Sequence, residues 1–261
     1  MELHPTPYPD LNAVLDTLVQ RVQDTLGSSF VAACLQGSFA VGDFDEHSDV
    51  DFTMVVQDAL TEAQVRALQE VHAAVYDLDC AWAKHLEGSY FPKDVLKDYQ
   101  RQGEDLWYLD NGSRALLRST HCNTVVVRWT VRQYGIALAG PAPLSLVDPI
   151  PVQVLRADIL ATINDWGAEI LAEPERFNNR FYQGFIVLSF CRMLRDLIVG
   201  DTGSKRAGAE WAKANLDPGW RDLIDRTWAT RPVPEVSVRT PADPQDFART
   251  LEFVRYIQKQ V

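Results

Sequence analysis

The sequence predicts a chain of two domains, an α/β domain over residues 1–150 followed by an all-α domain over residues 151–261. In the first third of the chain, short apolar runs of strand length alternate with stretches of helical periodicity. Further along, the apolar residues recur mainly at helical spacing. Two proline pairs, at 140–143 and 148–151, form the strongest linker signal and place the boundary between the domains.

The first domain is predicted to begin with a helix, a strand, a short helix, a strand, a longer helix and a strand. Three prolines exclude a helix before Asp10, which is expected to cap the first one. Thr61 and Gln64 have the spacing of a capping box. Apart from the short helix, the expected elements are a helix over 10–26, strands over 30–35 and 50–56, a helix over 61–76 and a strand over 80–87 that ends before Gly88 and Pro92.

The remainder of the chain is predicted to be helical. One helix over 124–134 still belongs to the first domain and ends at Gly135. Beyond the proline pairs, apolar residues at helical spacing predict a helical bundle. Its expected helices cover 152–171, 181–199, 207–216 and 244–260, with a proline-rich loop over 232–241 before the last one.

Charge and composition limit the class of partner. The chain has 25 Lys and Arg residues against 36 Asp and Glu residues, a net charge of −11. Such a balance repels the phosphates of nucleic acids and suits a cationic partner. No apolar run reaches the ~20 residues that cross a bilayer, and no signal peptide precedes the first helix. We therefore expect a cytoplasmic monomer that binds neither nucleic acid nor a membrane.

The four cysteines agree with this expectation. Cys34, Cys80, Cys122 and Cys191 lie far apart, mostly among apolar residues, and form no CxxC pair. Reduced thiols packed inside the protein are therefore expected.

The main chemical signal follows the first predicted strand. Gly37 and Ser38 come directly after it, where a glycine lets backbone amides approach a phosphate and the serine hydroxyl can bind it. Asp49 and Asp51 are two residues apart at the start of the next strand, so both carboxylates point to the same face. Such a pair suits a divalent cation like Mg²⁺, which typically binds one or two protein carboxylates together with substrate phosphates.

An Asp-x-Asp pair alone also fits an acidic surface turn, here with Asp43, Asp45 and Glu46 as its neighbours. The order of the parts favours the functional interpretation. A strand is followed by Gly-Ser, by a spacer of about ten residues and by a strand that carries Asp-x-Asp, and each part has a mechanical reason.

This order resembles the signature of the nucleotidyltransferase superfamily that shares the catalytic domain of DNA polymerase beta. Further stretches are similar to the aminoglycoside adenylyltransferases that modify streptomycin and spectinomycin. They are found at 138–141, 147–151, 188–192 and at Lys205 with 209–212, in both halves of the chain. The resemblance implies a polymerase-beta-like nucleotidyltransferase domain, with a mixed sheet and flanking helices, and a C-terminal helical bundle that contacts substrate and nucleotide.

The same resemblance assigns roles in the first domain. It makes Glu87 the third catalytic carboxylate and the general base that deprotonates the acceptor hydroxyl. It makes Asp49 and Asp51 the catalytic metal ligands that hold Mg²⁺ against the triphosphate of ATP, which Gly37 and Ser38 bind. A carboxylate base beside a metal-bound phosphate is chemically coherent. The alternative for Glu87 is a solvent-facing charge at the end of a strand.

In the second domain the resemblance implies two ligands of the ATP phosphates, Arg192 and Lys205. Arg192 lies in a largely apolar helix, where a buried cation needs an anion. That anion is either a phosphate or a carboxylate such as Asp196 or Glu210. Lys205 precedes a predicted helix and is either a phosphate ligand or a solvated lysine. ATP and acceptor are expected to meet in the cleft between the domains.

The chain departs from this family at one position. The streptomycin and spectinomycin enzymes carry an acidic residue near the start of the arginine-bearing helix that helps to hold the drug, whereas this chain has Tyr182 there. The identity of the acceptor is therefore open. Trp107 and Asp105 are candidates to stack on or pair with a cationic sugar, although Trp107 also fits a core position. His121 and Cys122 lack the second pair that a zinc site needs.

The sequence thus predicts an ATP-dependent nucleotidyltransferase that adenylylates a hydroxyl of a small cationic acceptor, an aminoglycoside or aminocyclitol antibiotic, and releases pyrophosphate. Two alternatives stay open. One is a protein-hydroxyl adenylyltransferase of the antitoxin or regulator type, against which the long helical second half counts. The other is a catalytically silent module that binds a nucleotide or ligand, against which the presence of all three carboxylates counts.

Overall fold

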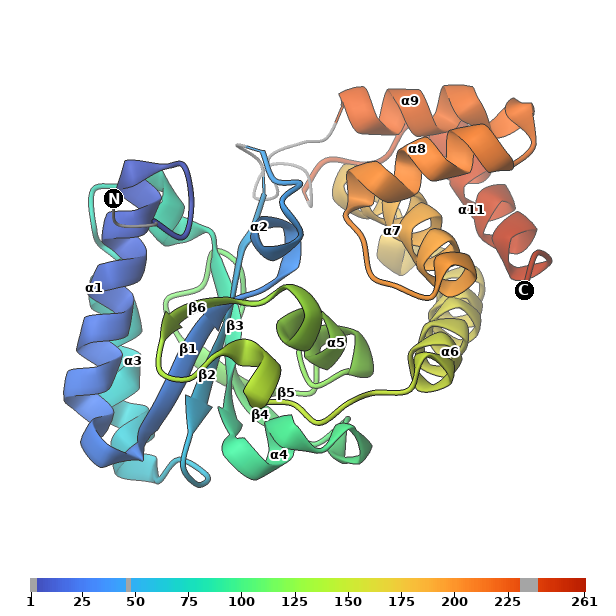
Figure 1. Ribbon diagram of the computed structural model, residues 1–261. Helices are drawn as coiled ribbons and strands as arrows, with labels where there is room; N and C mark the ends of the chain where they lie inside the picture. Colours follow the sequence, from blue (N-terminus) through green and yellow to red (C-terminus); the bar gives the residue numbers. More distant parts are fainter. Residues whose placement is uncertain (1–3, 46–47, 231–238) are drawn as a thin grey trace. The chain divides into compact units, whose positions relative to one another are not determined.

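Two compact units make up the protein in the computed structural model, which describes residues 4–45, 48–230 and 239–261 (Figure 1). Unit 1 is Met1–Ile150 and unit 2 is Pro151–Val261, so the division falls within the second proline pair. Glu46 of the predicted acidic turn and most of the predicted loop 232–241 lie outside the described residues. Among the described helices, none combines the length and the apolar character needed to cross a membrane.

A mixed sheet forms the centre of unit 1 (Figure 1). The six strands that the structure describes are ordered β5-β4-β3-β2-β1-β6. β2 and β3 run parallel, and all other neighbours in the sheet are antiparallel. The strands are β1 (Phe30–Leu35), β2 (Val50–Val56), β3 (Leu86–Pro92), β4 (Leu106–Leu109), β5 (Leu116–Ser119) and β6 (Ile136–Ala139). This sheet confirms the predicted fold class of the first domain.

β1 and β2 occupy the predicted residues, but the prediction of the third strand over 80–87 is wrong. Ala81–Lys84 form a 3₁₀ turn, and β3 begins only at Leu86. Gly88 continues the strand because β2 and β3 approach closely there: a Cβ at Gly88 would lie 2.2 Å from the carbonyl oxygen of Phe52. The four-residue strands β4, β5 and β6 escape prediction, since they are too short for a clear alternating pattern.

One face of the sheet is covered by α1 (Pro9–Leu26) and α3 (Glu62–Tyr76), which pack against each other (Figure 1). The predicted start of α1 is corrected by one residue, because proline is tolerated in the first turn and Asp10 is already helical. The predicted capping box of α3 is present, since the Thr61 hydroxyl accepts from the Gln64 backbone and the Gln64 side chain accepts from the Thr61 backbone.

On the opposite face lie α2 (Gly37–Val41) and α5 (Val125–Tyr134), which pack together, while α4 (Lys93–Lys97) follows β3. Arg128 of α5 is fully buried, and its guanidinium donates to the backbone carbonyls of Val95 and Leu96. These hydrogen bonds tie α5 to α4. The second residues of β2 and β3, Asp51 and Glu87, are only partly buried on this face.

Unit 2 confirms the predicted helical bundle. α7 is its central element and packs against the four other helices that the structure describes in this unit. α9 is not among the predicted helices. Each end of the other four described helices lies within two residues of the prediction. The described helices are α6 (Val152–Ala172), α7 (Arg180–Val199), α8 (Lys205–Asn215), α9 (Arg221–Ala229) and α11 (Pro244–Gln258).

A buried histidine lies between α3 and the sheet. His72 is 1% exposed, and its Nε2 lies 2.8 Å from the Tyr90 hydroxyl oxygen. Its ring also stacks on Phe52. Burial lowers the pKa of His72 to about 4, because the apolar surroundings disfavour the imidazolium.

We expect His72 to make the folded protein less stable in acid. Below pH 6.5 the unfolded chain binds a proton at His72, whereas the folded protein does not until about pH 4. The free energy of unfolding should therefore fall between these pH values, by about 3 kcal/mol in total. Urea unfolding at several pH values, compared with His72→Gln, measures this difference. Parallel pH curves for the two proteins would contradict it.

Candidate active site

The three predicted carboxylates come together at one edge of unit 1. In the parallel ladder, Asp51 of β2 is paired with Glu87 of β3, each being the second residue of its strand. Asp49 precedes Asp51 by two residues and so points to the same face of the sheet. All three side chains are partly buried. The structure thus places Asp51 and Glu87 side by side, on the face opposite α1 and α3, and strand alternation directs Asp49 to the same face.

The Gly-Ser segment lies directly against this group. Gly37 starts α2 with φ +61°, and a Cβ on it would lie 2.0 Å from Asp51 Oδ2. Only glycine permits both this backbone angle and this close approach. The Gln36 backbone also donates to the Asp51 carbonyl at 2.9 Å. Ser38 is the second residue of α2 and is partly buried.

Four further polar side chains complete the group: Tyr108, Asp110, Asn111 and His121. The sequence predicts none of them as a site residue and suggests His121 only as a zinc ligand. The Tyr108 hydroxyl lies 2.8 Å from Glu87 Oε1 and 2.8 Å from Asp110 Oδ1. His121 Nε2 lies 3.3 Å from the same Glu87 oxygen. The Asn111 amide donates to Asp49 Oδ1. Tyr108 and Asp110 alternate at the end of β4, a period-2 pattern that would have been the only local sequence signal for them.

Negative charge dominates the electrostatics of this group. The pKa of His121 is raised, chiefly by its hydrogen bond with Glu87, with smaller contributions from the charges of Asp110 and Asp51 and with burial acting against them. Burial raises the pKa of the Tyr108 hydroxyl, and the adjacent Glu87 and Asp110 carboxylates raise it further. One cluster of carboxylates therefore acts on both groups, as expected for a site that binds cations.

The donor set fits a hard divalent cation with part of its coordination supplied by substrate. Asp49 and Asp51 offer carboxylate oxygens on one face, and the missing Cβ of Gly37 leaves room for the Asp51 carboxylate. Within the described residues, no group of three or more His, Cys, Asp or Glu side chains has the geometry to hold a metal ion alone. Phosphate oxygens would have to complete the coordination. The zinc pair that His121 and Cys122 suggest finds no support here.

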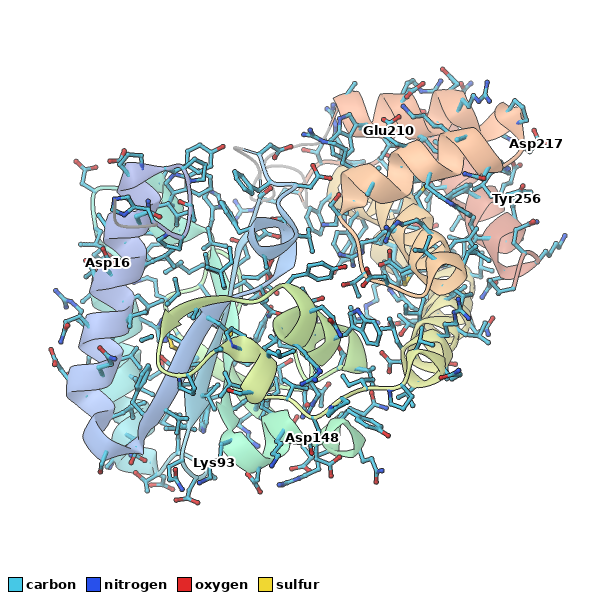
Figure 2. All side chains as sticks on the ribbon, viewed as in Figure 1. Asp16, Lys93, Asp148, Glu210, Asp217 and Tyr256 are labelled. Atoms are coloured by element: carbon cyan, nitrogen blue, oxygen red, sulfur yellow. The ribbon has the colours of Figure 1, made fainter. Side chains whose placement is uncertain are left out.

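Unit 2 contains the two predicted phosphate ligands. The two candidate carboxylate partners of Arg192 also pair with other cations: Asp196 lies 2.8 Å from Arg195, and the exposed Glu210 (Figure 2) lies 2.9 Å from Lys213. Burial raises the pKa of Asp196 to about 6, opposed by the neighbouring arginines. The binding of phosphate by Arg192 stays a prediction.

Lys205 is the first residue of α8, after the N-cap Ser204. Its ammonium lies 4.5 Å from the centroid of the Phe185 ring of α7, a cation–π contact. Tyr182 packs among aromatic rings, 5.2 Å from Phe177 between centroids. This end of α7 thus presents aromatic surface in place of a carboxylate.

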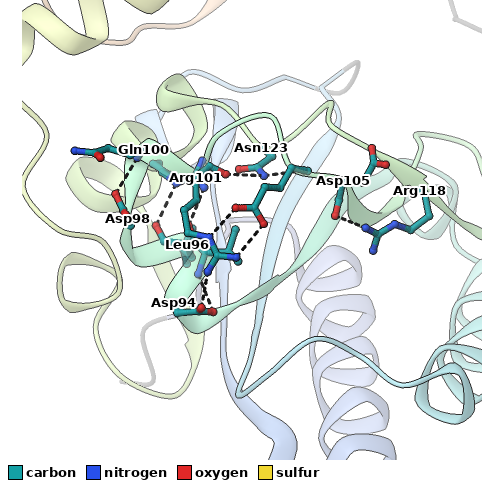
Figure 3. Close-up of polar contacts among 11 residues, drawn as sticks. Asp94, Leu96, Asp98, Gln100, Arg101, Asp105, Arg118 and Asn123 are labelled. Carbon is teal, nitrogen blue, oxygen red and sulfur yellow. Dashed lines mark hydrogen bonds and ion pairs between the residues drawn. The ribbon is translucent and has the colours of Figure 1, made fainter.

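Trp107 and Asp105 do not join the three carboxylates. Trp107 alternates with Tyr108 along β4 and therefore faces the α1 and α3 side of the sheet, against the core. Both residues line a cavity of about 280 Å³ where β2 and β3 end, whereas Asp51 and Glu87 lie where these strands begin. The polar groups around the cavity bond to one another; for example, the Arg118 guanidinium donates to the Asp105 carbonyl (Figure 3). The structure gives this pair no place beside the carboxylates.

Replacing Gly37 should disturb the site more than replacing a similar glycine nearby. Gly42 also has a left-handed backbone, φ +74°, but a Cβ there would meet nothing within 4 Å. Gly42→Ala should therefore cost about 1 kcal/mol of backbone strain. Gly37→Ala should cost about 1–3 kcal/mol more, because its new methyl group displaces Asp51. Urea unfolding measures the stability of both variants. Equal losses of stability would show that a methyl group at position 37 does not displace Asp51.

Three comparisons with known proteins agree with this architecture. Residues 145–259 match the family model described as aminoglycoside adenylyltransferase, C-terminal domain. Two curated relatives are aminoglycoside (3'') (9) adenylyltransferases. The one from Shigella flexneri is 22% identical, over 97% of this chain and 95% of its own length, and the one from Klebsiella pneumoniae is 23% identical, over 95% and 93%.

A solved structure has the same fold along nearly the whole chain. It is a spectinomycin adenyltransferase from Enterococcus faecialis, crystallised with ATP and spectinomycin. It superposes with a TM-score of 0.71 at 12% identity and covers 95% of this chain and 98% of its own. This match shows that the chain has the fold of that enzyme, and with the family model and the full-length relatives the chain is similar to aminoglycoside adenylyltransferases along nearly its whole length.

Proposed function

We propose that this protein transfers AMP from ATP to a hydroxyl of a small cationic acceptor, an aminoglycoside or aminocyclitol antibiotic, and releases pyrophosphate. The observation that carries the proposal is the pairing of Asp51 with Glu87, with Asp49 on the same face and Gly37 against Asp51. Relatives along the full length of the chain are adenylyltransferases of aminoglycosides. The similar solved structure binds ATP and spectinomycin, which supports both substrate classes.

In the proposed reaction, Glu87 accepts the proton of the acceptor hydroxyl as its oxygen attacks the α-phosphorus of ATP. The bond from the α-phosphorus to the bridging oxygen breaks, and pyrophosphate leaves with its electron pair. Gly37 and Ser38 bind the triphosphate through backbone amides and the Ser38 hydroxyl. From unit 2, Arg192 and Lys205 bind further phosphate oxygens.

Asp49 and Asp51 are the residues that would hold Mg²⁺ in this scheme. When bound, Mg²⁺ neutralises negative charge on the triphosphate and on the departing pyrophosphate. Asn111, which donates to Asp49 Oδ1, holds that carboxylate in place.

Charge supports a cationic acceptor. The whole chain carries a net charge of −11, and Asp110 adds a fourth carboxylate to the site through Tyr108. Carboxylates gathered on one face raise the local concentration of a polycation. Tyr182 stands where the resemblance implies an acid that helps to hold the drug, so we propose that the carboxylates of unit 1 supply more of this attraction here.

A screen for pyrophosphate release tests the function directly. The full chain is incubated with ATP and Mg²⁺ and with a panel of aminoglycosides and aminocyclitols, spectinomycin and streptomycin included. We expect release that depends on acceptor and ATP, with a product heavier than the drug by one AMP in mass spectrometry. A tagged protein in place of a tagged drug would indicate a protein-modifying enzyme. No release with any acceptor would contradict the proposal.

Removing one charge from the aspartate pair should stop the reaction while the fold stays intact. Asp49→Asn and Asp51→Asn are each expected to lower kcat by more than about 100-fold, because metal ligation weakens. The free energy of unfolding should hold or rise slightly, since a repulsion between like charges is relieved. Asp58→Asn, an exposed change beyond the other end of β2, is the matched control. Near-normal turnover of both site variants would refute the metal role.

Neutralising Glu87 should separate chemistry from binding. Glu87→Gln is expected to lower kcat by about 10²- to 10⁴-fold, the range for a lost general base, with unchanged affinity for ATP. Glu70→Gln, an exposed change on α3, serves as control. Single-turnover kinetics and ATP titration measure the two effects. Normal turnover of Glu87→Gln would remove Glu87 from the role of base.

A further inference from the structure

The carboxylate of Glu87 is held on one side only. Tyr108 Oη and His121 Nε2 both approach Oε1, at 2.8 and 3.3 Å. In the described part of unit 1, no hydrogen bond reaches Oε2 of Glu87, although the side chain is only 13% exposed. Two donors therefore hold Oε1, and Oε2 is left to accept the proton of a substrate hydroxyl.

The sheet fixes the position of the Tyr108 hydroxyl. β4 is antiparallel to β3 with Ser89 opposite Tyr108, so Tyr108 reaches diagonally across to Glu87 on the same face. The Tyr108 side chain is nearly buried, with the residue 5% exposed. Its ring packs against that of His121, 5.3 Å away between centroids. The hydroxyl thus has little freedom to leave Glu87.

Asp110 holds the Tyr108 hydroxyl from the other side. One hydroxyl has a single proton, yet carboxylate oxygens of Glu87 and Asp110 lie at 2.8 Å from it. The two carboxylates therefore share one donor, and the hydroxyl lies midway between them. Asp110 is exposed, whereas Glu87 is mostly covered, so Asp110 can turn to water while Glu87 keeps the bond.

We infer that Tyr108 and His121 are positioning residues that hold Glu87 through Oε1 and so direct Oε2 at the acceptor hydroxyl. The inference rests on the proposed function, in which Glu87 is the base. The last torsion of a glutamate side chain is broad, so a carboxylate without these donors would sample many orientations. Proton transfer needs one of them, within hydrogen-bond reach of the attacking hydroxyl.

Tyr108→Phe tests this role, because it removes the hydroxyl and keeps the ring. We expect kcat to fall about 10- to 100-fold, the equivalent of one hydrogen bond to a charged group. The KM values for ATP and acceptor should stay within about 2-fold, since in the proposed reaction Tyr108 acts only through Glu87. His121→Ala should show the same split between kcat and KM. Tyr76→Phe, on α3 at a distance from the site, is the matched control and should behave as the wild type.

A double-mutant cycle separates positioning from a general structural effect. If Tyr108 acts through Glu87, Tyr108→Phe should slow Glu87→Gln by less than about 2-fold. Equal losses of kcat in both backgrounds, or an unchanged kcat for Tyr108→Phe in the wild-type background, would overturn the inference while the proposed function stands. A wild type that transfers AMP to no acceptor would instead remove the proposed function, and this inference with it.

Discussion

The parallel pairing of β2 with β3 is the constraint on which the site depends. It places Asp51 directly beside Glu87, so two carboxylates from different parts of the chain become neighbours on one face. Two glycines allow the close contacts around this pair of strands. Gly88 lets β2 and β3 come together, and Gly37 leaves room for the Asp51 side chain. If β3 were shifted by one residue, Glu87 would face α1 and α3 and the site would lose its proposed base.

This arrangement gathers like charges, which is unfavourable unless cations or donors compensate. The structure supplies donors to the outer carboxylates: Asn111 to Asp49, and Tyr108 with His121 to Glu87. Carboxylates gathered in this way attract cations, which suits the cluster to a divalent cation and a polycationic acceptor. The same charge that would destabilise an empty site thus favours binding of the substrates we propose.

The sequence predicts those parts of the fold and site whose signals are local. β1, β2 and the α3 capping box were readable because apolar runs and cap residues are short-range patterns. The family resemblance identifies Glu87, although the predicted strand over 80–87 is misplaced. If Glu87 were the last residue of a strand parallel to β2, it would lie at the opposite end of the sheet from Asp51, which is near the start of β2. Tyr108 and Asp110 escaped because their place depends on the pairing of β4 with β3, which joins residues far apart in sequence.

The most direct test of the account is a crystal structure of the full chain with Mn²⁺ and an ATP analogue that resists cleavage. Mn²⁺ takes the place of Mg²⁺ and is located by its anomalous scattering. The account predicts one Mn²⁺ coordinated by Asp49 and Asp51 and by phosphate oxygens, with Glu87 beside the α-phosphate and held through Oε1. A nucleotide bound away from Gly37, or a metal ion that neither aspartate touches, would contradict it.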